Sequence, residues 1–104
     1  MADVEKITAV AEEAIGQGPN MLVPWYLIAS YAYYECDDPV ISDELYDRIC
    51  FLLMEAIDAI EIDHMHAYLC DPESLKAGTG YQIKDYPSRV VSVAQKFMSG
   101  ELPA

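Results

Sequence analysis

Basic residues are scarce in this chain of 104 residues: six Lys and Arg stand against eighteen Asp and Glu, giving a formal charge of -12. A surface with this balance repels phosphate groups, so the composition excludes an ordinary basic nucleic-acid-binding protein. It disfavours a surface of anionic lipid for the same reason. We therefore expect neither direct nucleic-acid binding nor membrane binding.

Long apolar runs and paired cysteines are also missing. No apolar stretch approaches the ~20 residues that cross a bilayer, and the first residues include Asp3 and Glu5 where a secretory leader would be basic and then apolar. The cysteines are three, an odd number, and form no CxxC pair; they are Cys36, Cys50 and Cys70. This usage predicts free thiols in a reducing cytoplasm, that of a bacterium or an infected host cell.

Apolar residues, by contrast, make up 53% of the chain, which excludes disorder as its default state. A chain of this length buries roughly two-thirds of the surface that it exposes when unfolded, enough for one core. The sequence therefore predicts a single domain over residues 1–104. We expect its core to contain Ile7, Val10, Leu45, Ile49, Leu52, Leu53, Ile57, Val91, Ala94 and Phe97.

Helical periodicity and helix-breaking residues predict an all-α fold with four main helices. The first covers 3–15, with Asp3 as its cap, and the second runs from Pro24 to about Cys36. After a proline turn, Ser42 caps a third helix that continues towards Leu69, so that a helical hairpin spans about 24–69. A short helix over 71–78, an extended segment over 81–86 and a helix from Pro87 to Gly100 complete the chain.

One group of side chains near the hairpin turn has the chemistry of a binding site. Asp43, Tyr46 and Asp47 are spaced i, i+3 and i+4, which places two carboxylates and a ring on one helical face. Tyr33 and Tyr34 lie across the turn, close enough to meet that face. Aromatic faces and carboxylates suit a flat cation such as an oxidised nicotinamide ring. In the alternative interpretation, the carboxylates only stabilise the helix start and the tyrosines only pack the hairpin.

The run from Tyr33 to Arg48 (YYECDDPVISDELYDR) resembles the signature of the small N-terminal helical domain of bacterial NAD-dependent DNA ligases, approximately Y-[YH]-x-x-D-x-P-x-I-[SP]-D-x-x-Y-D-x-L. In that family the domain binds the nicotinamide mononucleotide half of NAD. The resemblance covers about a quarter of the chain. It implies NAD or nicotinamide mononucleotide as a ligand and a nucleotide-binding role for five residues: Tyr33, Tyr34, Asp43, Tyr46 and Asp47.

The chain also departs from that family, because it lacks the lysine nucleophile of the family's K-x-D-G motif. The segment from Lys76 to Thr79 (KAGT) has no aspartate at the required place. We therefore expect a non-catalytic protein that does not seal DNA, similar to compact ligase-related proteins encoded as stand-alone genes, notably by bacteriophages. No catalytic residue is predicted.

Signals in the second half are weaker. Asp63, His64, His66 and Cys70 are metal-capable, with His66 and Cys70 at i, i+4 on the expected helix, but histidines at a core edge are the preferred interpretation and no metal site is predicted. Acidic neighbours oppose thiolate formation at Cys36. The segment 78–80 is interpreted as a loop. Further candidates for the face with the tyrosines are Tyr81, Lys84, Asp85 and Tyr86.

Two functions of different classes are preferred over a third, an enzyme that cleaves or transfers from NAD, because the sequence offers no nucleophile or general base for it beyond the same carboxylates. The first is a non-catalytic module that binds a nicotinamide nucleotide. The second is an acidic, phage-type inhibitor that mimics DNA and blocks a basic nucleic-acid-binding protein, as anti-defence and anti-CRISPR proteins do. One continuous acidic surface would favour mimicry, whereas Asp43 and Asp47 converging on a tyrosine-lined cleft would favour nucleotide binding.

Overall fold

Five α-helices and three short helical turns account for the secondary structure of residues 2–102, which the computed structural model describes. The α-helices are α1 (Val4–Ile15), α2 (Leu22–Ser30), α3 (Asp43–Asp58), α4 (Pro72–Ala77) and α5 (Ser88–Met98). The turns are two 3₁₀ segments, Pro19–Met21 and Ala67–Leu69, and a π-helical segment, Tyr31–Glu35. No strand occurs in the described range, and the expected all-α class is confirmed.

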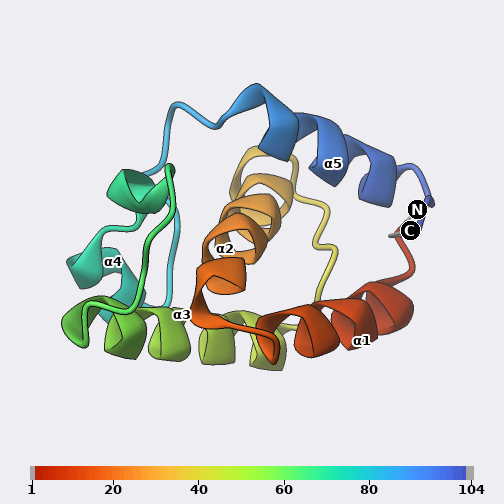
Figure 1. Ribbon diagram of the computed structural model, residues 1–104. Coiled ribbons are helices and arrows are strands. Elements are labelled where there is room, and N and C mark those ends of the chain that lie inside the picture. The colour runs from red at the N-terminus through yellow and green to blue at the C-terminus, as the bar shows by residue number, and fades with distance from the viewer. Residues whose placement is uncertain (1, 103–104) are drawn as a thin grey trace.

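Helix α2 is the centre of the molecule, with α3 on one side and α5 on the other (Figure 1). Every residue of α2 except Pro24 is buried, which explains why this helix is apolar all round rather than amphipathic. Ring stacking joins it to both neighbours. Trp25 lies 5.8 Å from Phe97 of α5, and Tyr26 lies 6.0 Å from Tyr46 of α3, measured between ring centroids.

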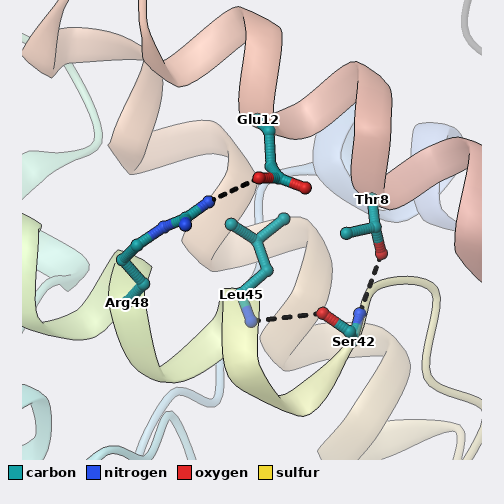
Figure 2. A network of polar contacts seen from close by, with 5 residues as sticks. All are labelled: Thr8, Glu12, Ser42, Leu45 and Arg48. Atoms are coloured by element: carbon teal, nitrogen blue, oxygen red, sulfur yellow. Dashed lines mark hydrogen bonds and ion pairs between the residues drawn. The ribbon is translucent and has the colours of Figure 1, made fainter.

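Local capping chemistry sets the start of α3 and ties it to α1 (Figure 2). The Ser42 hydroxyl accepts a hydrogen bond from the backbone N–H of Leu45 at 3.2 Å, as a helix N-cap does. The N–H of Ser42 itself donates to Oγ1 of Thr8 on α1 at 2.9 Å. One helical turn further on, Arg48 forms an ion pair of 2.9 Å with Glu12 of α1. The first turns of α3 are therefore tied to α1 at two points.

Helix α3 is shorter than the sequence predicts, because it ends at Asp58 instead of continuing towards Leu69. Ile60 adopts a left-handed conformation with φ of 57°. The Glu61 N–H donates to the Ala56 carbonyl at 2.8 Å and the Ile60 N–H donates to the Ile57 carbonyl at 3.0 Å. This pattern is a Schellman helix end, in which the left-handed residue is usually glycine. Because this residue is an isoleucine instead of a glycine, the sequence does not indicate that the helix ends here.

The predicted core is correct in its centre and wrong at its edge. Ile7, Leu45, Ile49, Leu53, Ala94 and Phe97 are buried, and Ile57 and Val91 are half-buried. Val10 and Leu52, however, are 36% and 37% exposed. α3 lies at the margin of the molecule and buries only a narrow stripe, so a leucine one position away from that stripe remains partly in solvent.

The segment before α5, which is expected to be extended over 81–86, begins with a turn and forms no strand. Residues 81–82 form a turn and 83–87 are irregular, without a neighbouring strand in the described range. None of the helices within residues 2–102 combines the length and the apolar character needed to span a membrane.

Candidate functional site

The five residues predicted to bind a nucleotide line one cavity of about 250 Å³. The cavity lies where the end of α2 and its π-helical extension meet the start of α3. Three segments complete its wall: Ala29 of α2, Pro39 to Ile41 of the hairpin turn, and Gly78 after α4. The structure thus brings together Tyr33, Tyr34, Asp43, Tyr46 and Asp47.

Tyr33 and Tyr34 reach the cavity from the π-helical segment Tyr31–Glu35. Their rings meet edge to face, with centroids 4.8 Å apart and planes at 69°. The segment ends where the N–H of Asp38 donates to the carbonyl of Ala32 at 2.9 Å and where Asp37 adopts a φ of 50°. π-Helical turns widen a helix locally and often occur at functional sites. The sequence does not reveal this turn, because nothing in its periodicity separates Tyr31–Glu35 from α2.

Tyr46 is held more firmly than the sequence predicts. Its ring stacks on Tyr26, and its hydroxyl is 2.8 Å from the hydroxyl of Ser30, which is fully buried. Burial raises the pKa of Tyr46 well above its usual value of 10.0. Tyr46 is therefore half-buried: the residue packs against the core and also lines the cavity.

Asp43 and Asp47 supply the negative charge of the cavity. Both carboxylates are exposed, and neither receives a hydrogen bond or an ion pair from residues 2–102. They lie one turn apart on α3, with Asp43 in the first turn, where the helix dipole favours a negative charge. Their acceptor oxygens are therefore available to a ligand with N–H or O–H groups.

Gly78 lines the cavity next to Asp47. It ends α4 in a left-handed conformation, with φ of 71°, and a Cβ at this position would lie 3.6 Å from Oδ1 of Asp47. The next residues cross over the contact between α2 and α3. The Tyr26 hydroxyl donates to the Thr79 carbonyl at 2.8 Å, and Gly80 is buried against Ser30. These contacts join residues about fifty positions apart, so the sequence alone does not predict the role of this loop.

The metal-capable residues of the second half do not converge on this cavity. The expected helical pairing of His66 with Cys70 is wrong, because residues 61–70 form no α-helix and Ala67–Leu69 is a 3₁₀ turn. His64 and His66 lie side by side with ring centroids 5.6 Å apart, and burial lowers the pKa of His64. Within residues 2–102 no group of three metal-ligating side chains is assembled.

The thiols differ in their surroundings. Cys36 is exposed, whereas Cys50 and Cys70 are buried. Burial raises the pKa of Cys50 to about 11 and that of Cys70 to about 12. The two buried thiols are therefore protonated at neutral pH and poor nucleophiles.

Comparison of the chain with known protein families, with curated proteins and with solved structures gives no significant match. The residues that line the cavity therefore indicate which ligands it can bind. These residues combine aromatic faces, two carboxylates without a partner among residues 2–102, and apolar residues at Val40 and Ile41. Such a set can bind a flat organic cation that carries hydrogen-bond donors.

Proposed function

We propose that this protein binds an oxidised nicotinamide nucleotide, NAD or nicotinamide mononucleotide, in the cavity between α2 and α3. The observation that carries the proposal is the convergence of Tyr33, Tyr34, Asp43, Tyr46 and Asp47 on one cavity. The spacing of these residues along the chain resembles the nucleotide-binding signature of NAD-dependent DNA ligases, and their side chains lie together in space.

The cavity suits this ligand in charge and in size. The nicotinamide ring is planar and cationic when oxidised, so tyrosine faces and carboxylates both attract it. The amide and ribose hydroxyl groups can donate to Asp43 and Asp47, whose oxygens have no partners within residues 2–102. Pockets for drug-sized ligands enclose ~300–1,000 Å³, so a volume of about 250 Å³ fits a ring and its sugar rather than a whole dinucleotide.

Titration calorimetry with oxidised and reduced nicotinamide mononucleotide tests the proposal. The oxidised form should bind about tenfold more tightly, because reduction removes the ring charge and a cation–π energy of about 1–2 kcal/mol. Asp47→Asn should lower the affinity for the oxidised form and weaken this preference. Glu44→Gln is the matched control, because Glu44 is exposed on the same helix but does not line the cavity. Equal or absent binding of the two redox forms by the unmodified protein would refute the proposal.

We propose no catalytic step for this chain. In this proposal the protein acts as a stand-alone, ligase-related binding protein in the cytoplasm of a bacterium or of a phage-infected host cell. Incubation with labelled NAD followed by denaturing electrophoresis should show no covalent adenylate. A covalent label on Lys76 or Lys84 would instead reveal a nucleophile that the sequence does not predict.

The alternative proposal is an acidic inhibitor that mimics DNA and binds a basic protein. It is favoured by the exposure of every acidic side chain except that of Asp38, which is half-buried. Asp37 precedes α3 and Glu61 follows it, so acidic groups lie at both ends of a helix about 24 Å long. Mimicry predicts salt-sensitive binding to a basic nucleic-acid-binding protein and no heat with any nucleotide.

A further inference from the structure

We infer that Lys84 holds the phosphate of the bound nucleotide at a subsite on the rim of the cavity, an inference that rests on the proposed function. A nicotinamide nucleotide carries a positive ring and a negative phosphate. The cavity is complementary only to the positive ring. Its two ionic residues are Asp43 and Asp47, and no basic side chain of the described residues lines it.

The phosphate therefore needs a cation just outside the cavity. The chain offers few, because it has six basic residues and a charge of -12. Arg48 is already paired with Glu12. Lys6 belongs to α1, and two more basic residues, Arg89 and Lys96, belong to α5. Apart from the paired Arg48, only Lys76 and Lys84 lie on segments next to the cavity wall.

A row of aromatic rings connects Lys84 to that wall. Its Nζ lies over the ring of Tyr81, 4.8 Å from the centroid. Tyr81 in turn meets Tyr34 edge to face, with centroids 6.1 Å apart and planes at 79°. Tyr34 is part of the cavity wall and contacts Tyr33 in the same manner. The ammonium group thus lies at the end of an aromatic surface that begins inside the cavity.

The loop that carries Tyr81 and Lys84 is fixed by its neighbours. Gly80 and Ile83 are buried, and the Ile83 N–H donates to the Gly80 carbonyl at 3.1 Å. The Tyr81 N–H donates to Oγ1 of Thr79, also at 3.1 Å. Because Gly80 and Ile83 are buried, they anchor the loop, and the side chains of Tyr81 and Lys84 are exposed on the surface. A cation held in this way loses less conformational freedom when it binds a phosphate.

Lys76 lies in a different place. It lines a neighbouring cavity of about 460 Å³, which shares Asp47 and Gly78 with the first, and it belongs to the last turn of α4. A phosphate there would meet the negative end of that helix and the carboxylate of Glu55. Lys76 is therefore the matched control: its removal changes the net charge by the same amount at a site that does not favour phosphate.

The experiment compares two ligands that differ by one phosphate, oxidised nicotinamide riboside and oxidised nicotinamide mononucleotide, by titration calorimetry at low salt. The unmodified protein should bind the mononucleotide more tightly. Lys84→Gln should lower the affinity for the mononucleotide about two- to fivefold, the effect of an exposed ion pair, and leave the riboside unchanged. Lys76→Gln should leave both affinities unchanged. Circular dichroism and thermal midpoints verify that both variants fold.

The outcomes separate this inference from the proposed function. If the riboside binds and the mononucleotide gains nothing over it, the cavity binds nicotinamide but the phosphate subsite is refuted. The subsite is also refuted if Lys84→Gln leaves the mononucleotide affinity unchanged, or if Lys76→Gln reduces it equally. If neither ligand binds the unmodified protein, the proposed function fails and the subsite fails with it.

Discussion

The hydroxyl groups of Ser30 and Tyr46 lie 2.8 Å apart and connect α2 to α3 directly beneath Gly80. Ser30 is fully buried in the described core, among side chains that are apolar or aromatic. The pair lies behind the candidate cavity, since Tyr46 presents its ring there. This polar contact thus joins the central helix to the helix with both carboxylates, and the loop with Tyr81 and Lys84 packs against it at Gly80.

A double-mutant cycle should detect this contact. Tyr46→Phe removes one hydroxyl and leaves that of Ser30 buried without a partner, so it should lower the free energy of unfolding by about 1–3 kcal/mol. Ser30→Ala removes the other hydroxyl. The double variant should be less unstable than the sum of the two single variants, by about 1 kcal/mol, in urea denaturation. Strict additivity would show that the two hydroxyls do not interact.

Gly80→Ala should destabilise the protein by about 1–3 kcal/mol, because the new methyl group overpacks the core. It would lie 2.7 Å from Cβ of Ser30 and 3.0 Å from the hydroxyl of Tyr46. Gly18→Ala is the control: Gly18 is in extended backbone with open space around it, and alanine there should be neutral or slightly stabilising. Equal thermal midpoints for the two variants would contradict the close packing of this loop.

How far the sequence predicts this fold depends on the range of each interaction. The caps of α1, α3 and α4 are local: Asp3, Ser42 and Asp71 each accept a hydrogen bond from the third residue after them, and all three helix starts follow from the sequence. The spacing of Asp43, Tyr46 and Asp47 is equally local. Only a short turn is needed to bring these residues close to Tyr33 and Tyr34, and Pro39 predicts that turn.

The remaining features depend on contacts between distant segments. The approach of Gly80 to Ser30 and the bond from Tyr26 to Thr79 join residues that no periodicity relates. Burial on all sides of α2 removes the amphipathic pattern that would orient it. These contacts decide which residues close the cavity, so the sequence offers Lys84 as a candidate for the tyrosine face but does not predict that Gly78 lines the cavity.

Leu53 and Leu52 should respond very differently to truncation. Leu53 is fully buried, and Leu53→Ala should cost about 2–5 kcal/mol of stability through lost burial and a residual cavity. Leu52 is 37% exposed, and Leu52→Ala should cost less than about 1 kcal/mol. The measurement is the free energy of unfolding in urea. A larger loss for Leu52→Ala than for Leu53→Ala would mean that α3 is rotated about its axis.

Ile60→Gly should stabilise the protein by about 0.5–1 kcal/mol. Ile60 adopts a φ of 57° at the end of α3. This conformation is unfavourable for a residue that has a Cβ and is readily adopted by glycine. Its side chain is 90% exposed, so little burial is lost with it. The thermal midpoint should rise for Ile60→Gly and fall for the control Ala59→Gly, because Ala59 has a negative φ of -84°. A fall in both variants would contradict the left-handed helix end.

The three cysteines should separate into one reactive and two protected thiols. Cys36 is exposed and should react with an aromatic disulfide reagent at pH 8, whereas Cys50 and Cys70 should react only after denaturation. Their folded pKa values of about 11 and about 12 exceed the ordinary value of 9.0, so the folded state favours the protonated thiols. Their contribution to stability is therefore complete below pH 9 and is lost as the pH rises towards 12. Cys36→Ser should abolish the fast reaction and leave this alkaline loss unchanged; three fast thiols in the native protein would contradict the burial of Cys50 and Cys70.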